Sequence, residues 1–283
     1  MFSDRLESPR CLPTSGGATP ALLVALAATC LLIGCATLPE PLAGACSSKA
    51  EEIASARAPA LSDRLEVLSW NIEKASNTGW AEDLAELSGD VNLAFIQEAS
   101  LQAAIPAVMD YPLHQTFVPG YTTPELETGV MTLSSSAPRM SCDFTSWEPW
   151  LGTPKATSVT EFPLAGRSDR LLAINLHAVN FALGLTEFRG QFNALKDVLD
   201  RHRGPIILAG DLNTWSEERR AMVTGFAREY DLAPVTFKPD LRTRFFGQAV
   251  DHLYVRGMRA ESARVIPVTT SDHNPLRVSL VLD

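Results

Sequence analysis

Acidic, amide and imidazole side chains recur in this chain where short apolar runs end or are interrupted. The residues concerned are Asn71, Glu73, Glu98, His177, Asn180, Asp211, Asn213, Asp251, Asp272 and His273. In α/β folds the ends of strands converge at one rim, and binding sites form there. A carboxylate can hold a metal ion or accept a proton from water, and an imidazole can hold or transfer a proton. The pattern therefore predicts acid–base chemistry assisted by a metal ion.

The carboxylates favour a hard divalent cation. Glu98, Asp272 and Glu73 offer oxygen ligands, which Mg²⁺ and Mn²⁺ prefer while they keep several bound waters. The spacing of cysteines and histidines matches no structural zinc site. We therefore expect Mg²⁺, or Mn²⁺ in its place, as the cofactor.

The dipeptide Asp272-His273 stands just before the last apolar run, and Pro275 keeps the turn tight. Neighbouring residues on an extended segment point to opposite sides, so these two side chains are not expected to be partners. Taken alone, such a dipeptide is ordinary at a protein surface. The sequence Gly210-Asp211-Leu212-Asn213 is in the same way open to interpretation as a simple turn.

The elements that must position these residues follow from apolar periodicity. Strands are expected over residues 65–71, 91–97, 129–133, 156–162, 170–177, 205–209, 250–255 and 276–282, and helices over 79–89, 186–203 and from 214 toward 230. The helix over 186–203 rests on an apolar stripe, and Thr214 with Glu217 matches a capping box. Residues 110–127, with three prolines and Gly120, are expected to form a loop. This mixture indicates one α/β domain over residues 61–283.

The first 34 residues are similar to the signal peptide of a bacterial lipoprotein. Arg5 and Arg10 precede an apolar run, 21–34, which is short for a membrane span but suits a signal-peptide core. The run ends in Leu31-Leu32-Ile33-Gly34-Cys35, which resembles a lipobox and predicts a lipid anchor at Cys35. An uncleaved anchor helix is the alternative. Both interpretations place the domain outside the cytoplasm, and the first predicts the periplasmic side of the outer membrane.

Residues 35–60 are rich in Ala, Ser and Pro without periodicity, which predicts a flexible tether. Processing at Cys35 would leave Cys46 and Cys142 as the remaining candidates for pairing among the five cysteines. They could form a disulfide in an oxidising compartment or stay free structural thiols, and the sequence leaves both open.

The composition is that of an ordinary packed protein, with 46% hydrophobic residues and a formal net charge of −9. The negative charge argues against tight electrostatic binding of DNA, which uses a basic face. It leaves room for an enzyme with a locally basic or metal-lined pocket, so nucleic acid stays a possible but disfavoured substrate. Arg242 and Arg244, beside two phenylalanines, either hold an anionic substrate or form a solvated loop.

Six motifs in a fixed order point to a known family. They are WNIEK at 70–74, QE at 97–98, NLHAVN at 175–180, GDLNTW at 210–215, VDHLYV at 250–255 and SDHNPL at 271–276. Over residues 65–283 the chain resembles the endonuclease/exonuclease/phosphatase superfamily, which includes deoxyribonuclease I, apurinic endonucleases and neutral sphingomyelinases. The runs at 128–134, 175–184 and 271–276 look like a little-characterised bacterial branch. The resemblance implies a four-layer sandwich of two packed, mainly antiparallel β-sheets flanked by helices.

The resemblance also implies how the metal is held. Glu98 would be the principal metal ligand, and Asp272 would complete the metal site. Asn71 would orient the metal site and the phosphate. Glu73 is a further candidate ligand, although many members of the superfamily have a different residue at this place.

The phosphate side of the site follows from the same resemblance. Asp211 would activate or orient the attacking water, and Asn213 would bind a phosphate oxygen. His273 would donate a hydrogen bond to the scissile phosphate and be positioned by Asp251. The residues expected to contact the phosphate from the other side are His177 and Asn180. Some nucleases of the superfamily pair the central histidine with a glutamate, for which the candidates here are Glu125 and Glu127.

These observations predict a monomeric, lipid-anchored, metal-dependent hydrolase of phosphoric esters, in the first place a phosphodiesterase. The candidate substrates are nucleic acid, a phospholipid head group and a small phosphorylated metabolite. The alternative is a catalytically silent member that binds ligands with the same rim. A complete set of acids and histidines argues against a silent protein, because a binding module does not need Asp211 and His273 together.

Overall fold

The computed structural model describes residues 45–48, 59–109, 113–149, 151–182 and 184–283. The chain divides into two compact units, Met1–Leu38 and Pro39–Asp283, and the description below concerns the second. The predicted signal peptide, the anchor at Cys35 and most of the tether lie outside the described residues. Within the described ranges, no helix is long and apolar enough to cross a membrane.

One sheet has seven strands and is antiparallel except at one place. Its order is β1 (Ala45–Ser48), β6 (Met140–Glu148), β7 (Thr153–Pro163), β8 (Arg170–Leu176), β9 (Ile206–Asp211), β13 (Asp251–Arg256) and β10 (Ala233–Pro234). The strands β8 and β9 are parallel neighbours. Their carboxyl ends therefore lie at the same edge of the sheet.

The second sheet has six strands and repeats this feature. Its order is β14 (Met258–Val265), β15 (Leu276–Leu282), β2 (Arg64–Asn71), β3 (Leu93–Ser100), β5 (Glu127–Ser134) and β4 (His114–Thr122). Here β2 and β3 are the parallel neighbours. A short separate pair, β11 (Arg244–Phe245) and β12 (Gln248–Ala249), precedes β13.

The two sheets pack face to face because apolar side chains alternate along their strands. Leu65 and Val67 of β2 join a core cluster with Ala173 of β8 and Ile207 of β9, whereas Leu68 of β2 belongs to a cluster on the other face of its sheet. This alternation is what a strand with both faces covered requires.

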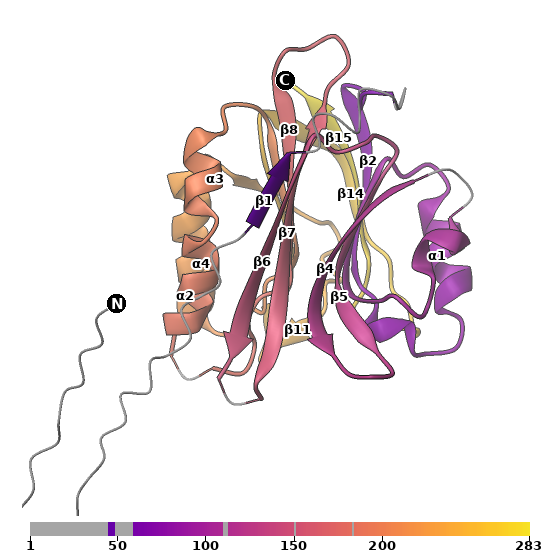
Figure 1. Ribbon diagram of the computed structural model, residues 1–283, viewed down its shortest axis with the longest axis vertical. Helices are drawn as coiled ribbons and strands as arrows, with labels where there is room; N and C mark the ends of the chain where they lie inside the picture. Colours follow the sequence, from indigo (N-terminus) through magenta and orange to yellow (C-terminus); the bar gives the residue numbers. More distant parts are fainter. Residues whose placement is uncertain (1–44, 49–58, 110–112, 150, 183) are drawn as a thin grey trace, which may run out of the picture. The chain divides into compact units, whose positions relative to one another are not determined.

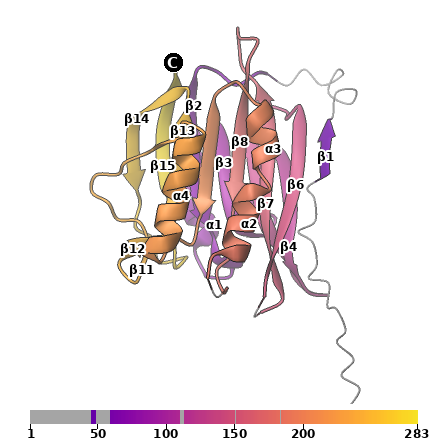
Figure 2. The same cartoon turned by 90° about the vertical axis from the view of Figure 1, so that its left-hand side faces the viewer.

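Helices cover the outer face of each sheet. The helix α1 (Trp80–Ser88) and the short 3₁₀ turns η1 (Glu73–Ala75) and η2 (Ile105–Val108) lie on the side of the six-stranded sheet, and α2 (Thr186–Asn193), α3 (Lys196–Arg201) and α4 (Glu217–Glu229) lie on the seven-stranded sheet (Figures 1 and 2). The predicted four-layer sandwich is therefore confirmed. All core clusters draw their members from residues 61–282, so the unit Pro39–Asp283 has its own hydrophobic core and is expected to fold alone.

Two predictions about helices need correction. The single helix over 186–203 is two helices, because Leu195 N bonds Phe192 O in a tighter turn between them. The predicted stripe nevertheless packs in the core cluster on that face. The residue that caps α4 is Ser216, whose side chain accepts a hydrogen bond from Arg219 N, and not Thr214.

The predicted loop over 110–127 is wrong, because β4 lies within it. Pro119 is tolerated there since β4 is an edge strand, where a missing N–H breaks no central ladder. The strands β6 and β14 were not predicted. In β14, which is also an edge strand, most side chains are exposed, so it lacks the apolar alternation by which a strand is recognised.

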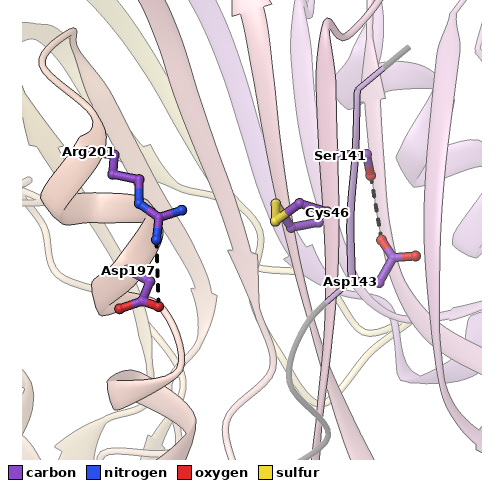
Figure 3. The surroundings of a disulfide bond; sticks show 6 residues. Cys46, Ser141, Asp143, Asp197 and Arg201 are labelled. Carbon is purple, nitrogen blue, oxygen red and sulfur yellow. Dashed lines mark hydrogen bonds and ion pairs between the residues drawn. A yellow bond between two sulfur atoms is a disulfide. The ribbon is translucent and has the colours of Figure 1, made fainter.

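Cys46 and Cys142 form a disulfide, which decides between the two possibilities that the sequence left open. They are direct partners in the antiparallel pairing of β1 with β6 (Figure 3). The bond closes a loop between residues 96 positions apart and holds β1 on the edge of the seven-stranded sheet.

A buried amide joins the sheets close to the site. Asn175 Nδ2, on β8, donates to the carbonyl oxygens of Ile96 and Met131 on the other sheet, and its Oδ1 accepts from Gln97 Nε2 at 2.7 Å. Asn175 and Gln97 are fully buried. Gln97 directly precedes Glu98, and Asn175 stands two residues before His177. The contact between the two amides therefore sets the distance between these two candidate site residues.

Replacing Asn175 with alanine is expected to lower the free energy of unfolding by about 3 kcal/mol, because several buried polar groups lose their partner. Urea unfolding of Pro39–Asp283 measures this loss. Asn92→Ala, which removes a half-buried amide that contacts only its own sheet, serves as the control. Equal losses for the two variants would contradict a special role for the bridge between the sheets.

Candidate active site

The site lies at one end of the sandwich, where the parallel pairs of both sheets finish. Asn71 ends β2, Glu98 lies near the end of β3, His177 follows β8 and Asp211 ends β9. Gly210 permits the close approach of β9 to β8, since its φ is 142° and a Cβ there would lie 2.0 Å from Leu176 O. The fold thereby brings together residues that are far apart in the sequence.

Asp211 is fixed through both of its carboxylate oxygens. Asn71 Nδ2 donates to Oδ2 at 3.2 Å from the other sheet, and the backbone N of Asn213 donates to Oδ1 at 3.0 Å. The Asn213 side chain donates to Ala178 O. All three residues are buried. The carboxylate of Asp211 is therefore held in one position where the two sheets meet.

His273 and Asp251 form a buried pair beside Asp211. The Nδ1 atom of His273 lies 2.9 Å from both carboxylate oxygens of Asp251, and its Nε2 lies 3.8 Å from Asp211 Oδ2. Asp251 and Asp211 are cross-strand partners on β13 and β9. Burial by itself lowers the pKa of the His273 imidazole, but Asp251 and Asp211 raise that pKa to about 10. His273 is therefore an imidazolium that presents Nε2–H toward Asp211.

The loop that carries His273 is held from the six-stranded sheet. Trp70 Nε1 donates to His273 O, and Ser271 Oγ donates to Asn71 O at 2.7 Å. His273 N in turn donates to Ser271 Oγ. The histidine thus receives its acid partner from one sheet and its backbone position from the other.

His177 has the opposite electrostatic environment. Its Nε2 lies 3.1 Å from Lys155 Nζ, 3.5 Å from Asp211 Oδ2 and 3.9 Å from Glu98 Oε1. Burial and then the charge of Lys155 lower the pKa of His177 to about 4. An ammonium group can only donate, so Nε2 of His177 accepts from Lys155. The group that bears positive charge on this side of the site is therefore Lys155.

Sequence reasoning missed Lys155 and Lys74. Lys155 lies on β7, the strand next to β8, and no motif marks it. Lys74 Nζ lies 2.5 Å from Glu98 Oε2. Burial by itself raises the pKa of Glu98, but His177 and Lys74 lower it to about 2. Lys74 belongs to the WNIEK motif, so its position was a signal that could have been used. Within the described part of the chain, the carboxylates next to His177 are those of Glu98 and Asp211, and not those of Glu125 or Glu127.

The candidate metal ligands form an acidic group at the solvent side. Glu73 Oε2 accepts a hydrogen bond from Asp272 N at 3.1 Å, and the side chain of Asp272 is 57% exposed. Burial and the charges of Glu73 and Glu98 raise the pKa of Asp272 against the opposing charge of His273. Carboxylates that disfavour one another's ionisation in this way are suited to a shared divalent cation.

A second arrangement could also hold a metal. Ligand atoms of Asp211, Asp251 and His273 lie within 4.8 Å of one another, and all three residues are buried. Asp251, however, already contacts Nδ1 of His273 with both oxygens. Glu73, Glu98 and Asp272 offer the oxygen ligands that a hard cation prefers, and no imidazole of the described residues lies within hydrogen-bond distance of Glu98 or Asp272, although Glu98 is paired with Lys74.

Backbone strain accompanies three of the candidate residues. Glu73, Glu98 and Asn213 have φ values of 48°, 49° and 46°, in the left-handed region that non-glycine residues rarely adopt. Glu98 lies at an irregularity in the pairing of β3 with β5. Strain of this kind is characteristic of functional sites, because the surrounding structure must enforce it.

Asn180 is turned toward a supporting layer. Its Oδ1 accepts from Trp215 Nε1 at 2.8 Å, and its backbone N donates to the buried Glu148. Arg219 donates to the carbonyl oxygens of Val179 and Asn180, with its guanidinium 4.5 Å from the ring centre of Trp215. These contacts fix the loop after His177. Sequence reasoning missed Glu148 and Arg219, because nothing in their local sequence distinguishes them from surface charges.

A groove of about 250 Å³ opens beside the site. Glu98, Lys155 and His177 line it, and all three are buried or half-buried. The exposed side chains of Leu151 and Phe181 line the same groove. A larger hollow of about 500 Å³ lies at the opposite end of the sandwich, but its Arg167 and Arg170 are already paired with acids. Of these two hollows, the smaller groove is the one that candidate site residues line.

The two arginines that the sequence left open are engaged with the protein. Arg242 and Arg244 both contact Asp240, at 2.8 Å each. Arg242 also donates to Asp251 O. Arg242 thus supports the segment that holds Asp251, and neither arginine is a free anion-binding group.

Comparison with known proteins identifies the family of this chain. The family model described as "Endonuclease/Exonuclease/phosphatase family" matches residues 68–273. The chain belongs to the endonuclease/exonuclease/phosphatase family. The match includes every candidate residue of the site from Asn71 to His273.

The relatives of this chain include UPF0294 proteins. One from Vibrio vulnificus is 38% identical over 221 residues, covering 77% of this chain and 78% of the relative. One from Yersinia pestis is 38% identical over 217 residues, covering 76% and 82%. The family model confirms the sequence-based resemblance to the superfamily.

Solved structures of the endonuclease/exonuclease/phosphatase family share the fold. A family protein from Leptotrichia buccalis has a TM-score of 0.58 at 13% identity, covering 76% of this chain and 99% of that one. The catalytic domain of human Nocturnin has a TM-score of 0.57 at 16% identity, covering 80% and 97%. A mannosyl-6-phosphatase from Bacteroides thetaiotaomicron has a TM-score of 0.57 at 18% identity, covering 77% of this chain and 100% of that one. At these identities the likeness shows the fold alone.

The pair of Asp251 and His273 is expected to make the stability of the protein depend on pH. The folded pKa of His273, about 10, exceeds its ordinary value of about 6.5. The contribution of the protonated His273 to the free energy of unfolding is fully present below about pH 6.5. It is lost as the pH rises toward about 10. Asp251→Asn is expected to cost about 3 kcal/mol at neutral pH and to flatten this dependence. Urea unfolding in EDTA across this pH range measures both effects, and parallel curves for the two proteins would contradict the assignment.

Proposed function

We propose that this protein is a phosphodiesterase that uses Mg²⁺, or Mn²⁺ in its place, to hydrolyse a phosphodiester with water. The observation that carries the proposal is the buried pair of Asp251 and His273, held beside Asp211 by residues of both sheets. Membership of a family whose solved relatives include phosphatases supports the same class of reaction.

The metal would be held by Glu98 and Asp272, with Glu73 as the further candidate. When bound, the cation supplies positive charge that stabilises the charge developing on the phosphate. Asp211 is positioned by Asn71 and Asn213 to take a proton from the attacking water.

The remaining residues neutralise the phosphate. His273 directs Nε2–H to a phosphate oxygen, while Asp251 keeps its Nδ1 occupied. Lys155 offers an ammonium group from the other wall of the groove, and His177 positions it. Such fixed donors, aimed at a developing charge in a partly dry site, account for much of the rate of phosphoryl transfer.

Purified Pro39–Asp283 is expected to hydrolyse bis-p-nitrophenyl phosphate with Mg²⁺ or Mn²⁺ and to lose this activity in EDTA. Asp211→Asn and His273→Ala should each lower kcat/KM by about 10²–10⁴-fold, and Lys155→Met should chiefly raise KM. Asp169→Asn, an acid at the opposite end of the sandwich, is the matched control. Activity that survives EDTA and both catalytic substitutions would exclude the mechanism, and inactivity on every diester would favour a silent binding protein.

We also propose that the protein is tethered to the cell envelope through a lipid at Cys35. The support is the lipobox-like sequence that ends the apolar run. The full-length protein expressed in bacteria is expected to partition into the detergent phase of a Triton X-114 extract, and Cys35→Ser is expected to shift it to the aqueous phase. Equal partitioning of the two proteins would show that Cys35 is not the anchor.

A further inference from the structure

Large apolar side chains exposed to solvent gather at one end of the sandwich. Eight such residues occur in the part of the chain that the structure describes, and we call them the apolar rim: Leu101, Tyr121, Trp147, Leu151, Phe181, Leu241, Phe245 and Phe246. Each lies in or next to a turn at the end that holds the candidate site, the lower end in Figure 1. The turns at the other end contribute none among the described residues.

Members of the rim lie on two sides of the site. Trp147 and Leu151 flank the turn between β6 and β7, and Phe181 follows β8 beyond His177. On the other side, the ring centre of Phe245 lies 6.2 Å from that of His273. Phe246 next to it is 89% exposed. Single exposed apolar residues are ordinary, but their confinement to one end indicates a surface that contacts something apolar.

The first residue of β1 points toward this same end of the sandwich. β1 is antiparallel to β6, with Ala45 opposite Asp143 and Ser48 opposite Met140. Since β6 runs toward Glu148 at the site end, Ala45 is the end of β1 that lies nearer the site. The disulfide of Cys46 with Cys142 fixes β1 on the domain.

The length of the preceding chain limits where an anchor can be. Nine residues lie between Cys35 and Ala45, and the ten steps from one Cα to the other span at most about 35 Å. From Asp143 to the end of β6 is five residues, or about 17 Å along the strand. A membrane that holds Cys35 is thus within reach of the apolar rim. The same bound applies if the apolar run before Cys35 is an uncleaved helix.

We infer that the apolar rim docks on the surface of a lipid bilayer and that the site takes the phosphodiester of a phospholipid head group. The groove inside the rim has a polar floor, with Glu98, Lys155 and His177, below exposed apolar side chains. A phospholipid has the same arrangement, because its charged phosphate lies next to its apolar chains. Trp and Tyr, which the rim contains as Trp147 and Tyr121, favour the interface of a bilayer because their rings are amphipathic. The statement about substrate rests on the proposed function, whereas the docking surface does not.

The docking surface is tested by binding alone. Pro39–Asp283 is incubated with vesicles of phosphatidylethanolamine and phosphatidylglycerol in EDTA, and the sedimented fraction is measured. The double variant Trp147→Ser/Phe246→Ser is expected to bind at least about tenfold more weakly, since burying one large apolar side chain is worth that order in an equilibrium. Phe246→Leu should retain most of the binding. Val281→Ser, a half-buried position at the opposite end, is the matched control.

Unchanged binding of the double variant would overturn the docking surface. So would a wild type that sediments as a dimer in the ultracentrifuge, does not bind vesicles and becomes monomeric in the double variant, because the rim would then bind a second copy. These outcomes do not depend on catalysis. The failure of the proposed function, which is inactivity on soluble diesters, is therefore a separate result.

The substrate class is tested by comparing two reactions with Mg²⁺. In the double variant, hydrolysis of vesicle phospholipid is expected to fall about tenfold or more, while kcat/KM for bis-p-nitrophenyl phosphate stays at the wild-type value. Turnover of a single-stranded oligonucleotide that falls in the double variant, together with no hydrolysis of vesicle phospholipid by the wild type, would overturn the lipid assignment and assign the rim to nucleobases.

Discussion

The hydrogen bond from Asn71 to Asp211 is the contact on which the site depends. It joins the last residue of β2 in one sheet to the last residue of β9 in the other. The buried amide pair of Gln97 and Asn175 sets the spacing of the sheets immediately behind it. Unpaired polar groups are costly in a dry interior, so the pairing of such a bridge matters. Both amide nitrogens of the bridge are paired, whereas Gln97 Oε1 is buried without a partner among the described residues. Hydrogen bonds therefore join the two sheets directly behind the site.

The two histidines of the site show how neighbours decide the charge of the same side chain. Both are buried, and burial disfavours the imidazolium in each. Asp251 reverses this effect at His273, whereas Lys155 adds to it at His177. One wall of the site thus carries its positive charge on an imidazole and the other on an ammonium group. Between them lies Asp211, which neither sheet could position alone.

Much of the fold and of the site could be predicted. Local apolar patterns indicated the strands, whereas the two-sheet sandwich and the roles of the site residues followed from the resemblance that the six motifs carry. The strands β2, β3, β8 and β9 alternate or are continuously apolar, and each has a polar residue of the site at or next to its end. The supporting residues could not be predicted in the same way. Lys155 and Arg219 come from places without a motif, and only packing shows that they contact His177 and Asn180. The edge strand β14 was missed because its exposed side chains do not alternate.

The sequence by itself determined the family of the chain, the two-sheet sandwich and the residues whose types suit hydrolysis of a phosphate ester. It did so because motifs at strand ends are local and keep their order. Only the tertiary structure decided which residues are partners. It joined Cys46 to Cys142, Asp251 to His273 and Lys155 to His177. It also gathered the exposed apolar side chains at one end. Distances between strands that are remote in sequence depend on sheet order and register, which no local pattern specifies.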